Sequence, residues 1–167
     1  PIKVDVPTFR SKFLELYYSR YLRPLKDYVI GSLEFIMPAL ARVPWLYNGP
    51  MRLLPVQTLM AKVAGMVDSP LLTGIALDAE LQKRGIRYAN RDNIGALSAD
   101  EKARAVIVVQ DAFTTYFETQ LVLDALTLLQ ALGFTPLLAP YQANGKPLHV
   151  HGFLKAFART AERNSAM

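Results

Sequence analysis

The only two histidines of the chain, His149 and His151, are separated by a single residue. Imidazoles act as general acids and bases near neutral pH and are common metal ligands. Asp111 is the candidate carboxylate that would orient His149 as a catalytic base. A zinc site needs three or four protein ligands, so two histidines alone do not predict a metal. The residues allow one catalytic pair, His149 with Asp111, and no bound metal or cofactor is expected.

A structural role for the two histidines is the interpretation we favour. They precede a helix expected over residues 152–162, so they could cap its start or line a contact between domains. In an extended segment, residues two positions apart direct their side chains to the same side. On this interpretation the pair contributes packing and hydrogen bonds, and we expect no catalysis by the chain itself.

The second half of the chain alternates strand and helix patterns. Residues 105–110 are a continuous apolar run typical of a buried strand, and residues 134–139 predict a second strand. A turn over 111–115 and a helix over 116–132 separate them. Strand, helix and strand in this order predict parallel pairing with a right-handed crossover. Two strands are too few for a stable sheet, so another must come from before Val106 or from beyond Met167.

Local signals place the ends of that helix. Thr115 and Glu118 have the spacing of a capping box, and Gly133 suits the position just after a helix. Its apolar face is expected to consist of Phe117, Leu121, Leu128 and Leu132.

Polar side chains follow both predicted strands. In open α/β sheets, ligands bind beyond the carboxyl ends of the strands, so these residues should gather at one edge and bind an anion or a partner. The candidates are Asp111, Thr114, Thr115, Asn144, Lys146, His149 and His151.

The first half predicts helices interrupted by prolines. Asp5 is a suitable N-cap, and Pro7 suits the first turn of the helix that follows. Further helices are expected over 25–37, limited by Pro38, and over 51–67, after a turn at 48–50. The first helix carries an aromatic stripe at a spacing of four residues, which we expect to face the core. The stripe consists of Phe9, Phe13, Tyr17 and Tyr21.

The expected fold class is α/β, with a mostly helical first half followed by a partial parallel β-α-β-α unit of the Rossmann-like type. We expect a helical region over 1–67, a connection over 68–104 and the β-α-β-α half-domain over 105–167. Ser98 and Glu101 could cap a short helix within the connection.

Composition limits the classes of function. The 167 residues are 51% hydrophobic and carry a net charge of +5, with six basic against three acidic residues in positions 1–27. Nucleic-acid binding would need a denser basic patch. A basic helical surface that meets an acidic partner or anionic lipid is the alternative that the charge favours. No apolar run is long enough to predict a transmembrane helix.

Three segments resemble large bacterial FAD-linked oxidases of the D-2-hydroxyglutarate/D-lactate dehydrogenase type. Residues 111–118, D-A-F-T-T-Y-F-E, are similar to a D-P-F-T-S-Y-Y-E/D segment of that family. Residues 144–154, N-G-K-P-L-H-V-H-G-F-L, resemble a segment in which lysine often replaces the second histidine. Residues 1–11 resemble the stretch that follows the last cysteine of a ferredoxin-type cluster motif. Pro1 is not a natural start, so the chain is expected to begin inside a longer one.

The resemblance implies a C-terminal, electron-transfer-associated region of an FAD- and 4Fe-4S-dependent oxidoreductase acting on a D-2-hydroxyacid. FAD and the cluster would belong to upstream flavin and ferredoxin-like domains of the same chain. The second half would match part of a cysteine-rich CCG-type domain. Gln110-Asp111 stands where that domain usually has a cluster cysteine, so no cluster ligand is expected there.

The partners implied are those upstream domains and an electron acceptor. A cytoplasmic location is expected, with peripheral contact at the inner face of the membrane left open. The alternative is a small-anion or partner-binding α/β module with a basic helical docking surface.

Overall fold

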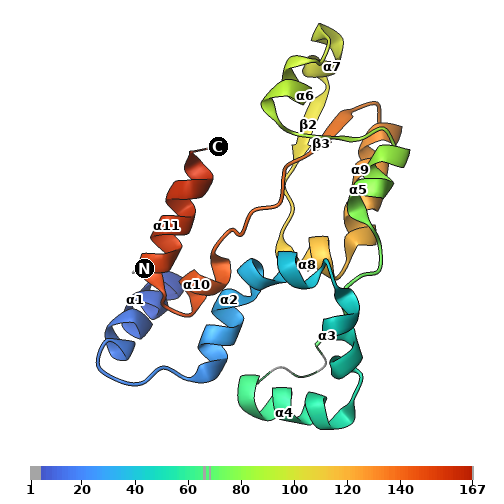
Figure 1. Ribbon diagram of the computed structural model, residues 1–167. Helices are drawn as coiled ribbons and strands as arrows, with labels where there is room; N and C mark the ends of the chain where they lie inside the picture. The colour runs from blue at the N-terminus through green and yellow to red at the C-terminus, as the bar shows by residue number, and fades with distance from the viewer. Residues whose placement is uncertain (1–4, 66, 68, 167) are drawn as a thin grey trace. The chain divides into compact units, whose positions relative to one another are not determined.

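The computed structural model describes residues 5–65, 67 and 69–166 of the chain (Figure 1). Residues 1–4, which begin the first of the three resembling segments, lie outside the described residues. The chain forms two compact units, one comprising Pro1–Leu71 with Ala143–Met167 and the other Leu72–Gln142. We call them the helical unit and the sheet unit, and each is described by itself.

The helical unit contains only helices among its described elements. Asp5 accepts a hydrogen bond from the backbone N–H of Thr8 at 3.2 Å, which confirms the predicted N-cap of the first helix. The helices are α1 (Val6–Tyr18), α2 (Leu25–Leu40), α3 (Pro44–Met51), α4 (Leu54–Ala64), α10 (Lys146–Val150) and α11 (Leu154–Ser165).

Proline interrupts these helices less than predicted. Pro38 lies inside α2, which continues to Leu40, and the expected turn at 48–50 lies inside α3. A proline removes one backbone donor, a cost that burial of other side chains in the same helix can offset. Met37 in α2 and Met51 in α3 are both buried. The helix predicted over 51–67 is present with narrower bounds, because α3 ends at Met51 and α4 runs from Leu54 to Ala64.

The aromatic stripe of α1 faces away from the core, contrary to the prediction. The side chains of Phe9, Phe13 and Tyr21 are 66%, 54% and 60% exposed. The opposite face is buried instead, where the Ser11 hydroxyl donates to the Pro7 carbonyl at 2.9 Å. Because Gly152 has no Cβ, its backbone lies close to the backbone of α1 at Ser11 and Glu15, and the face of α1 that carries Ser11 is the buried one.

The sheet unit is built on three short parallel strands in the order β1-β3-β2. The strands are β1 (Arg87–Tyr88), β2 (Ala105–Val108) and β3 (Thr135–Leu138). Ala105 pairs with Thr135 in register, and Arg87 pairs with Leu137. The parallel pairing is confirmed, and β1 supplies the further strand that was expected from before Val106. The α/β fold class is therefore confirmed, with helices predominating.

Helices pack against this sheet around one core. The helices of the unit are α5 (Leu77–Lys83), α6 (Arg91–Gly95), α7 (Ala99–Ala103), α8 (Ala112–Tyr116) and α9 (Thr119–Ala131). Among them, α9 packs on β3, and α5 and α8 pack on α9. The buried core consists of Leu81, Ile86, Val122, Leu123, Leu126 and Leu138. The predicted face of α9 was wrong, since Leu121, Leu128 and Leu132 are exposed. Both stripes of this helix are apolar, so periodicity alone could not select the buried one.

The capping boxes are only partly as predicted. Ser98 and Glu101 cap α7 reciprocally, which confirms that prediction. Thr115 and Glu118 do not form a capping box, because Thr115 already lies within α8. The capping box of α8 consists of Asp111 and Thr114. Gly133 follows α9 with a φ of +85°, as expected for the residue after a helix.

The compact units group the chain differently from the expected ranges 1–67, 68–104 and 105–167. α10 and α11 belong to the helical unit, where they pack on α1 and α2. The division of this chain into domains over 1–67, 68–104 and 105–167 stays a prediction. Among the described residues, no helix is both long and apolar enough to cross a membrane.

Candidate functional site

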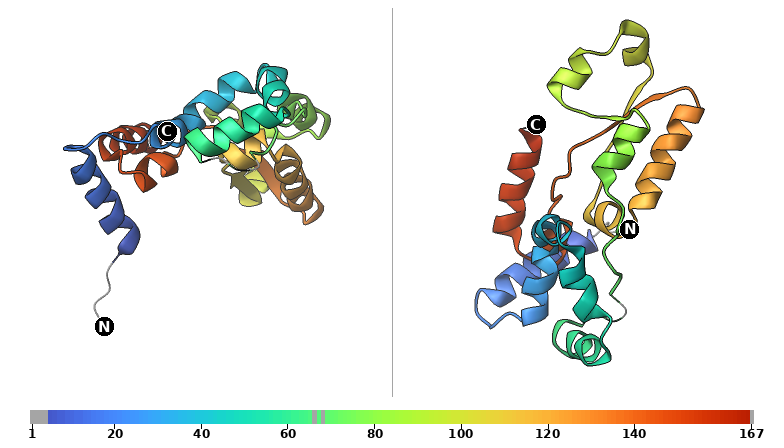
Figure 2. Two further views of the ribbon diagram at one scale, coloured as in Figure 1. Left: turned by 90° about the horizontal axis from the view of Figure 1, so that it is seen from below. Right: turned by 45° about the vertical axis from the view of Figure 1, so that its right-hand side comes forward.

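The histidine segment folds as a short helix between two left-handed glycines. Gly145, with a φ of +79°, precedes α10, and Gly152, with a φ of +69°, follows it. The short helix between them packs on α1 and α2, at the N-terminal end of the chain (Figure 2). His149 lies within α10 and His151 is its C-cap residue, so the segment is not extended at the two histidines. The one-sided arrangement of the two rings expected for a strand does not apply to this helical turn.

His151 contacts a buried carboxylate on α2. Its Nδ1 lies 3.1 Å from Oδ1 of Asp27, and Nη1 of Arg23 lies 3.6 Å from the other carboxylate oxygen. The side chains of Arg23 and Asp27 are only 8% and 7% exposed. Burying a carboxylate without charged or hydrogen-bonding partners is costly, and Arg23 and His151 both supply such partners to Asp27.

Arg23 also binds the backbone of the same turn. Its guanidinium donates to the carbonyls of His151 and Gly152, the second at 3.1 Å. The guanidinium carbon lies 4.3 Å from the ring centroid of Tyr18 and 3.9 Å from that of Phe153. Stacking of this kind satisfies the flat faces of the guanidinium while its edges donate hydrogen bonds. Arg23 thus connects the ends of α1 and α2 to the turn that follows α10.

A second carboxylate of α2 holds the start of α10. Glu34 is buried and accepts a hydrogen bond from the backbone N–H of Gly145 at 2.8 Å. Asp27, Gly31 and Glu34 lie on the buried face of α2, at the spacing of one helical stripe. Arg23 and Asp27 hold the end of α10, and Glu34 holds its beginning. We call these three charged residues the α2 clasp.

His149 has a different environment from His151. Its ring centroid lies 4.9 Å from that of Phe157 on α11. Hydrogen bonds from Thr8 hold the pKa of Asp5 below its ordinary value, and the charges of His149 and Lys12 contribute smaller effects in the same direction. His149 is therefore partly buried against an aromatic ring, on a short helix that packs on α1.

Two other candidates of the segment are exposed. The backbone N–H of Lys146 donates to Oδ1 of Asn144 at 2.7 Å, which fixes the turn into α10. Both side chains are exposed to solvent.

The remaining candidates belong to the sheet unit. Oδ1 of Asp111 accepts the backbone N–H of Thr114 at 2.9 Å, so this carboxylate acts as a helix cap. The buried Thr115 hydroxyl contacts Oε1 of Gln110 at 2.9 Å. The seven candidates are thus divided between the two units, and a shared edge, or a catalytic pair of His149 with Asp111, stays a prediction.

Sequence reasoning missed the three charged residues of the α2 clasp. Arg23, Asp27 and Glu34 were not singled out, although the two carboxylates are seven residues apart in an otherwise apolar helix. Charged residues on the apolar stripe of a helix are a signal of buried pairing. That signal could have identified the carboxylates, but not their partners more than a hundred residues away.

The donor chemistry of the chain does not fit an iron–sulfur cluster. The sequence has no cysteine, and the described residues contain no group of three or more histidine, aspartate or glutamate side chains placed to hold a metal. In the clasp, Asp27 contacts Arg23 and His151, and Glu34 accepts the Gly145 N–H, contacts that hold α10 in position.

Comparisons with known proteins identify close relatives. The chain is 52% identical over 165 residues to a protein named D-2-hydroxyglutarate dehydrogenase from Pseudomonas putida. Proteins of the same name from Escherichia coli and Haemophilus influenzae are 45% and 41% identical. Each match covers 99% of this chain but only 16% of the relative. No family model and no solved structure matches the chain.

The relatives agree with the resemblance of the three motif segments and extend it along almost the whole chain. The chain is therefore homologous, over nearly all of its length, to one segment of the bacterial proteins named D-2-hydroxyglutarate dehydrogenase, and it spans about a sixth of their length.

Proposed function

We propose that this chain is the C-terminal, electron-transfer-associated region of an FAD- and 4Fe-4S-dependent oxidoreductase that acts on a D-2-hydroxyacid, with D-2-hydroxyglutarate as the first substrate to test. The carrying observation is the match of nearly the whole chain to proteins named for that activity. The small share of each relative that the match covers supports a catalytic centre elsewhere in the longer protein.

Within that protein, the region has a structural role and performs no chemistry of its own. The contacts of Asp27 with Arg23 and His151 support this role, because these groups are used to hold the turn after α10. Asp111 likewise serves as the cap of α8. FAD and the cluster would be bound by other parts of the longer protein, since the donor set of this chain does not suit a cluster.

The partners of the region are then the flavin and ferredoxin-like domains of the same chain, together with an electron acceptor. A cytoplasmic location is part of the same proposal. These partners are inferred from the family resemblance, and the matching relatives support them only through their names.

The test uses the longer protein encoded by the same reading frame. We expect its purified form to contain FAD and a 4Fe-4S cluster, seen by absorbance and electron paramagnetic resonance, and to reduce an artificial acceptor with D-2-hydroxyglutarate. Failure to oxidise any D-2-hydroxyacid would overturn the assignment. His149→Ala and Asp111→Asn should leave kcat/KM within about twofold of the parent value. A loss of a hundredfold or more in kcat, with intact cofactor content, would show that the region is catalytic.

A further inference from the structure

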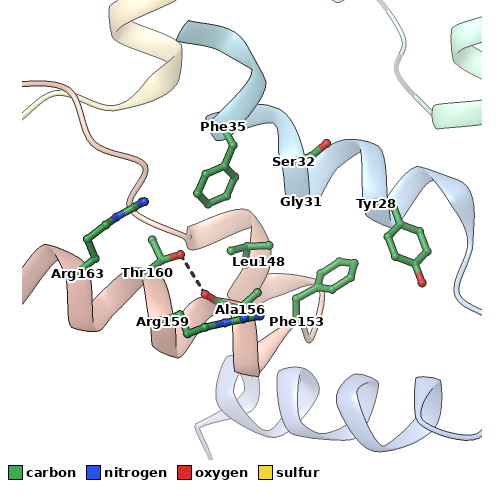
Figure 3. Close-up of a pocket in the computed structure, with 10 residues that line it drawn as sticks. All are labelled: Tyr28, Gly31, Ser32, Phe35, Leu148, Phe153, Ala156, Arg159, Thr160 and Arg163. Atoms are coloured by element: carbon green, nitrogen blue, oxygen red, sulfur yellow. Dashed lines mark hydrogen bonds between the residues drawn. The ribbon is translucent and has the colours of Figure 1, made fainter. Parts of the chain in front are cut away.

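An open cavity lies within the helical unit, beside the α2 clasp. It has a volume of about 380 Å³ and is lined by residues of α2, α10, α11 and the turn before α11 (Figure 3). Tyr28 and Phe35 contribute rings from α2, while Leu148 and Phe153 contribute apolar surface from α10 and the turn that follows it. The volume falls in the lower part of the range for small-molecule sites, which are concave and mostly apolar.

The shape of this cavity depends on small residues. Gly31 lies on its α2 side, where an added Cβ would be 3.1 Å from the ring of Phe153. Ala156 lies on the opposite side, on α11. A larger side chain at either position would occupy the space between the two helices, so these small residues keep the cavity open.

Two hydroxyl groups of the lining, those of Ser32 and Thr160, already donate hydrogen bonds. The Ser32 hydroxyl donates to the Val29 carbonyl at 2.9 Å, and the Thr160 hydroxyl donates to the Ala156 carbonyl at 3.0 Å. Their donors are therefore committed within their own helices. Polar recognition of a ligand would depend mainly on the charged groups of the lining.

Those charged groups are two arginines and no carboxylate. Arg159 and Arg163 are one helical turn apart on α11, and both line the cavity (Figure 3). Among residues 5–65, 67 and 69–166, neither guanidinium forms an ion pair. Arginine binds carboxylates through two parallel hydrogen bonds, and two arginines one turn apart can flank one anionic group.

We propose that this cavity binds a free amphiphilic carboxylate, with its aliphatic or aromatic body against Phe35, Leu148 and Phe153 and its carboxylate at Arg159 and Arg163. The apolar lining selects the body, and the charge of the two guanidinium groups selects the anion. This site is separate from the D-2-hydroxyacid chemistry of the proposed function. Binding to it is measured without turnover, so either proposal can fail while the other holds.

The test is isothermal titration calorimetry on the longer protein with hexanoate, octanoate and decanoate, each below its micellar concentration. Burying two more methylene groups should tighten binding about tenfold between successive members of the series. Decan-1-ol, which has the same chain without the charge, should bind at least about tenfold more weakly than decanoate. Equal binding of the acid and the alcohol, or no dependence on chain length, would overturn the proposal.

Matched variants locate the site. The double variant Arg159→Gln/Arg163→Gln should weaken decanoate binding about tenfold or more, whereas Lys155→Gln, an exposed charge on the same helix outside the lining, should change it less than about twofold. Ala156→Leu should abolish binding by filling the cavity, and Ala158→Leu, exposed on α11, should not. Melting curves identify any variant that fails to fold. If Ala156→Leu does not fold, the binding of decanoate to the Arg159→Gln/Arg163→Gln variant decides whether this cavity is the site.

Two further outcomes would contradict this assignment. Decanoate that binds equally well to the Ala156→Leu variant must occupy another site. Absence of binding to the parent would mean that the cavity is closed or filled by another part of the longer protein, such as a peptide segment.

Discussion

The imidazole of His151 lies 3.1 Å from the carboxylate of Asp27, a residue 124 positions earlier in the chain. This contact joins the beginning of the helical unit to its end, so the histidine segment is held in place by residues of α2. The same carboxylate faces Arg23, whose guanidinium also binds the backbone at Gly152. The turn after α10 is thus held by one buried cluster, through the contact of His151 with Asp27 and the hydrogen bonds of Arg23 to the backbone of the turn.

Removing the carboxylate at the centre of that cluster should loosen α10. Asp27→Ala leaves the buried Arg23 without its anion and His151 without its acceptor, a change that typically costs about 3 kcal/mol. We expect amide hydrogen exchange over residues 146–153 to accelerate by about a hundredfold in the longer protein. Glu162→Gln, which removes an exposed carboxylate from α11, should leave these rates within about threefold. Unchanged exchange in Asp27→Ala would contradict a stabilising role for the cluster.

The carboxylate of Glu34 should protect the backbone amide of Gly145 from hydrogen exchange. Glu34→Ala removes the acceptor of the Gly145 N–H, and an unsatisfied buried donor costs about 1–3 kcal/mol. The N–H of Gly145 should therefore exchange at least about fivefold faster, whereas Glu34→Gln, which keeps an acceptor oxygen, should have a smaller effect. Asn144→Ala is the control, because it removes an exposed acceptor from the neighbouring Lys146 N–H. Equal effects of Glu34→Ala and Asn144→Ala would show that burial of this bond is unimportant.

Gly152 should tolerate no side chain. A Cβ there would lie 2.7 Å from Cβ of Leu14 and 2.8 Å from both the Glu15 nitrogen and the Ser11 oxygen, and its φ is +69°. Overpacking and left-handed strain together should make Gly152→Ala destabilising by about 3 kcal/mol. Gly65→Ala has a similar φ of +65° with no atom within 4 Å of the added Cβ, so it should cost about 1 kcal/mol. Denaturant unfolding compares the two, and equal midpoints would contradict close packing at Gly152.

The buried face of α9 can be tested with two leucines of the same helix. Leu126 is fully buried in the core of the sheet unit, whereas Leu128 is 60% exposed. Leu126→Ala should destabilise the unit by about 3 kcal/mol, and Leu128→Ala by less than about 1 kcal/mol. The readout is amide exchange of the core residues Leu137 and Leu138. A larger effect for Leu128→Ala would restore the face that the sequence pattern favoured.

Sequence patterns predicted the local signals of this chain well. The N-cap at Asp5, the Ser98 and Glu101 capping box and the parallel strands are each determined by a few neighbouring residues or by a short apolar run. Local chemistry of this kind is readable without knowledge of distant contacts.

The sequence was a poorer guide to which face of each helix is buried. The stripe of Phe13 and Tyr17 on α1 was expected inside, yet the opposite face is buried, where Gly152, which has no Cβ, lies close to the backbone of Ser11. The α2 clasp was missed for a related reason. Its contacts, such as Glu34 with Gly145 across 111 positions, depend on tertiary packing that sequence spacing does not encode.

The capping box of α7 predicts a pH dependence. Hydrogen bonds from Ser98, with smaller contributions from Arg87 and Arg104, lower the pKa of Glu101 from its ordinary value of 4.5. Because the folded-state pKa is depressed, the stabilising contribution is fully present above about pH 4.5 and is lost as the pH falls through the lower folded-state pKa. Protein with ¹³C-labelled glutamate should therefore show a Glu101 carboxyl titrating below 4.5.

Ser98→Ala removes the hydroxyl of this box but keeps the backbone N–H, which donates to Oε2 of Glu101 at 2.7 Å. The pKa of Glu101 should then rise only part of the way towards its ordinary value. Arg87→Gln should raise it less, since Nη2 of Arg87 lies at 3.5 Å from the carboxylate and both side chains are partly exposed to solvent. If the arginine variant moves the pKa further than the serine variant does, then charge and not capping sets the titration of Glu101.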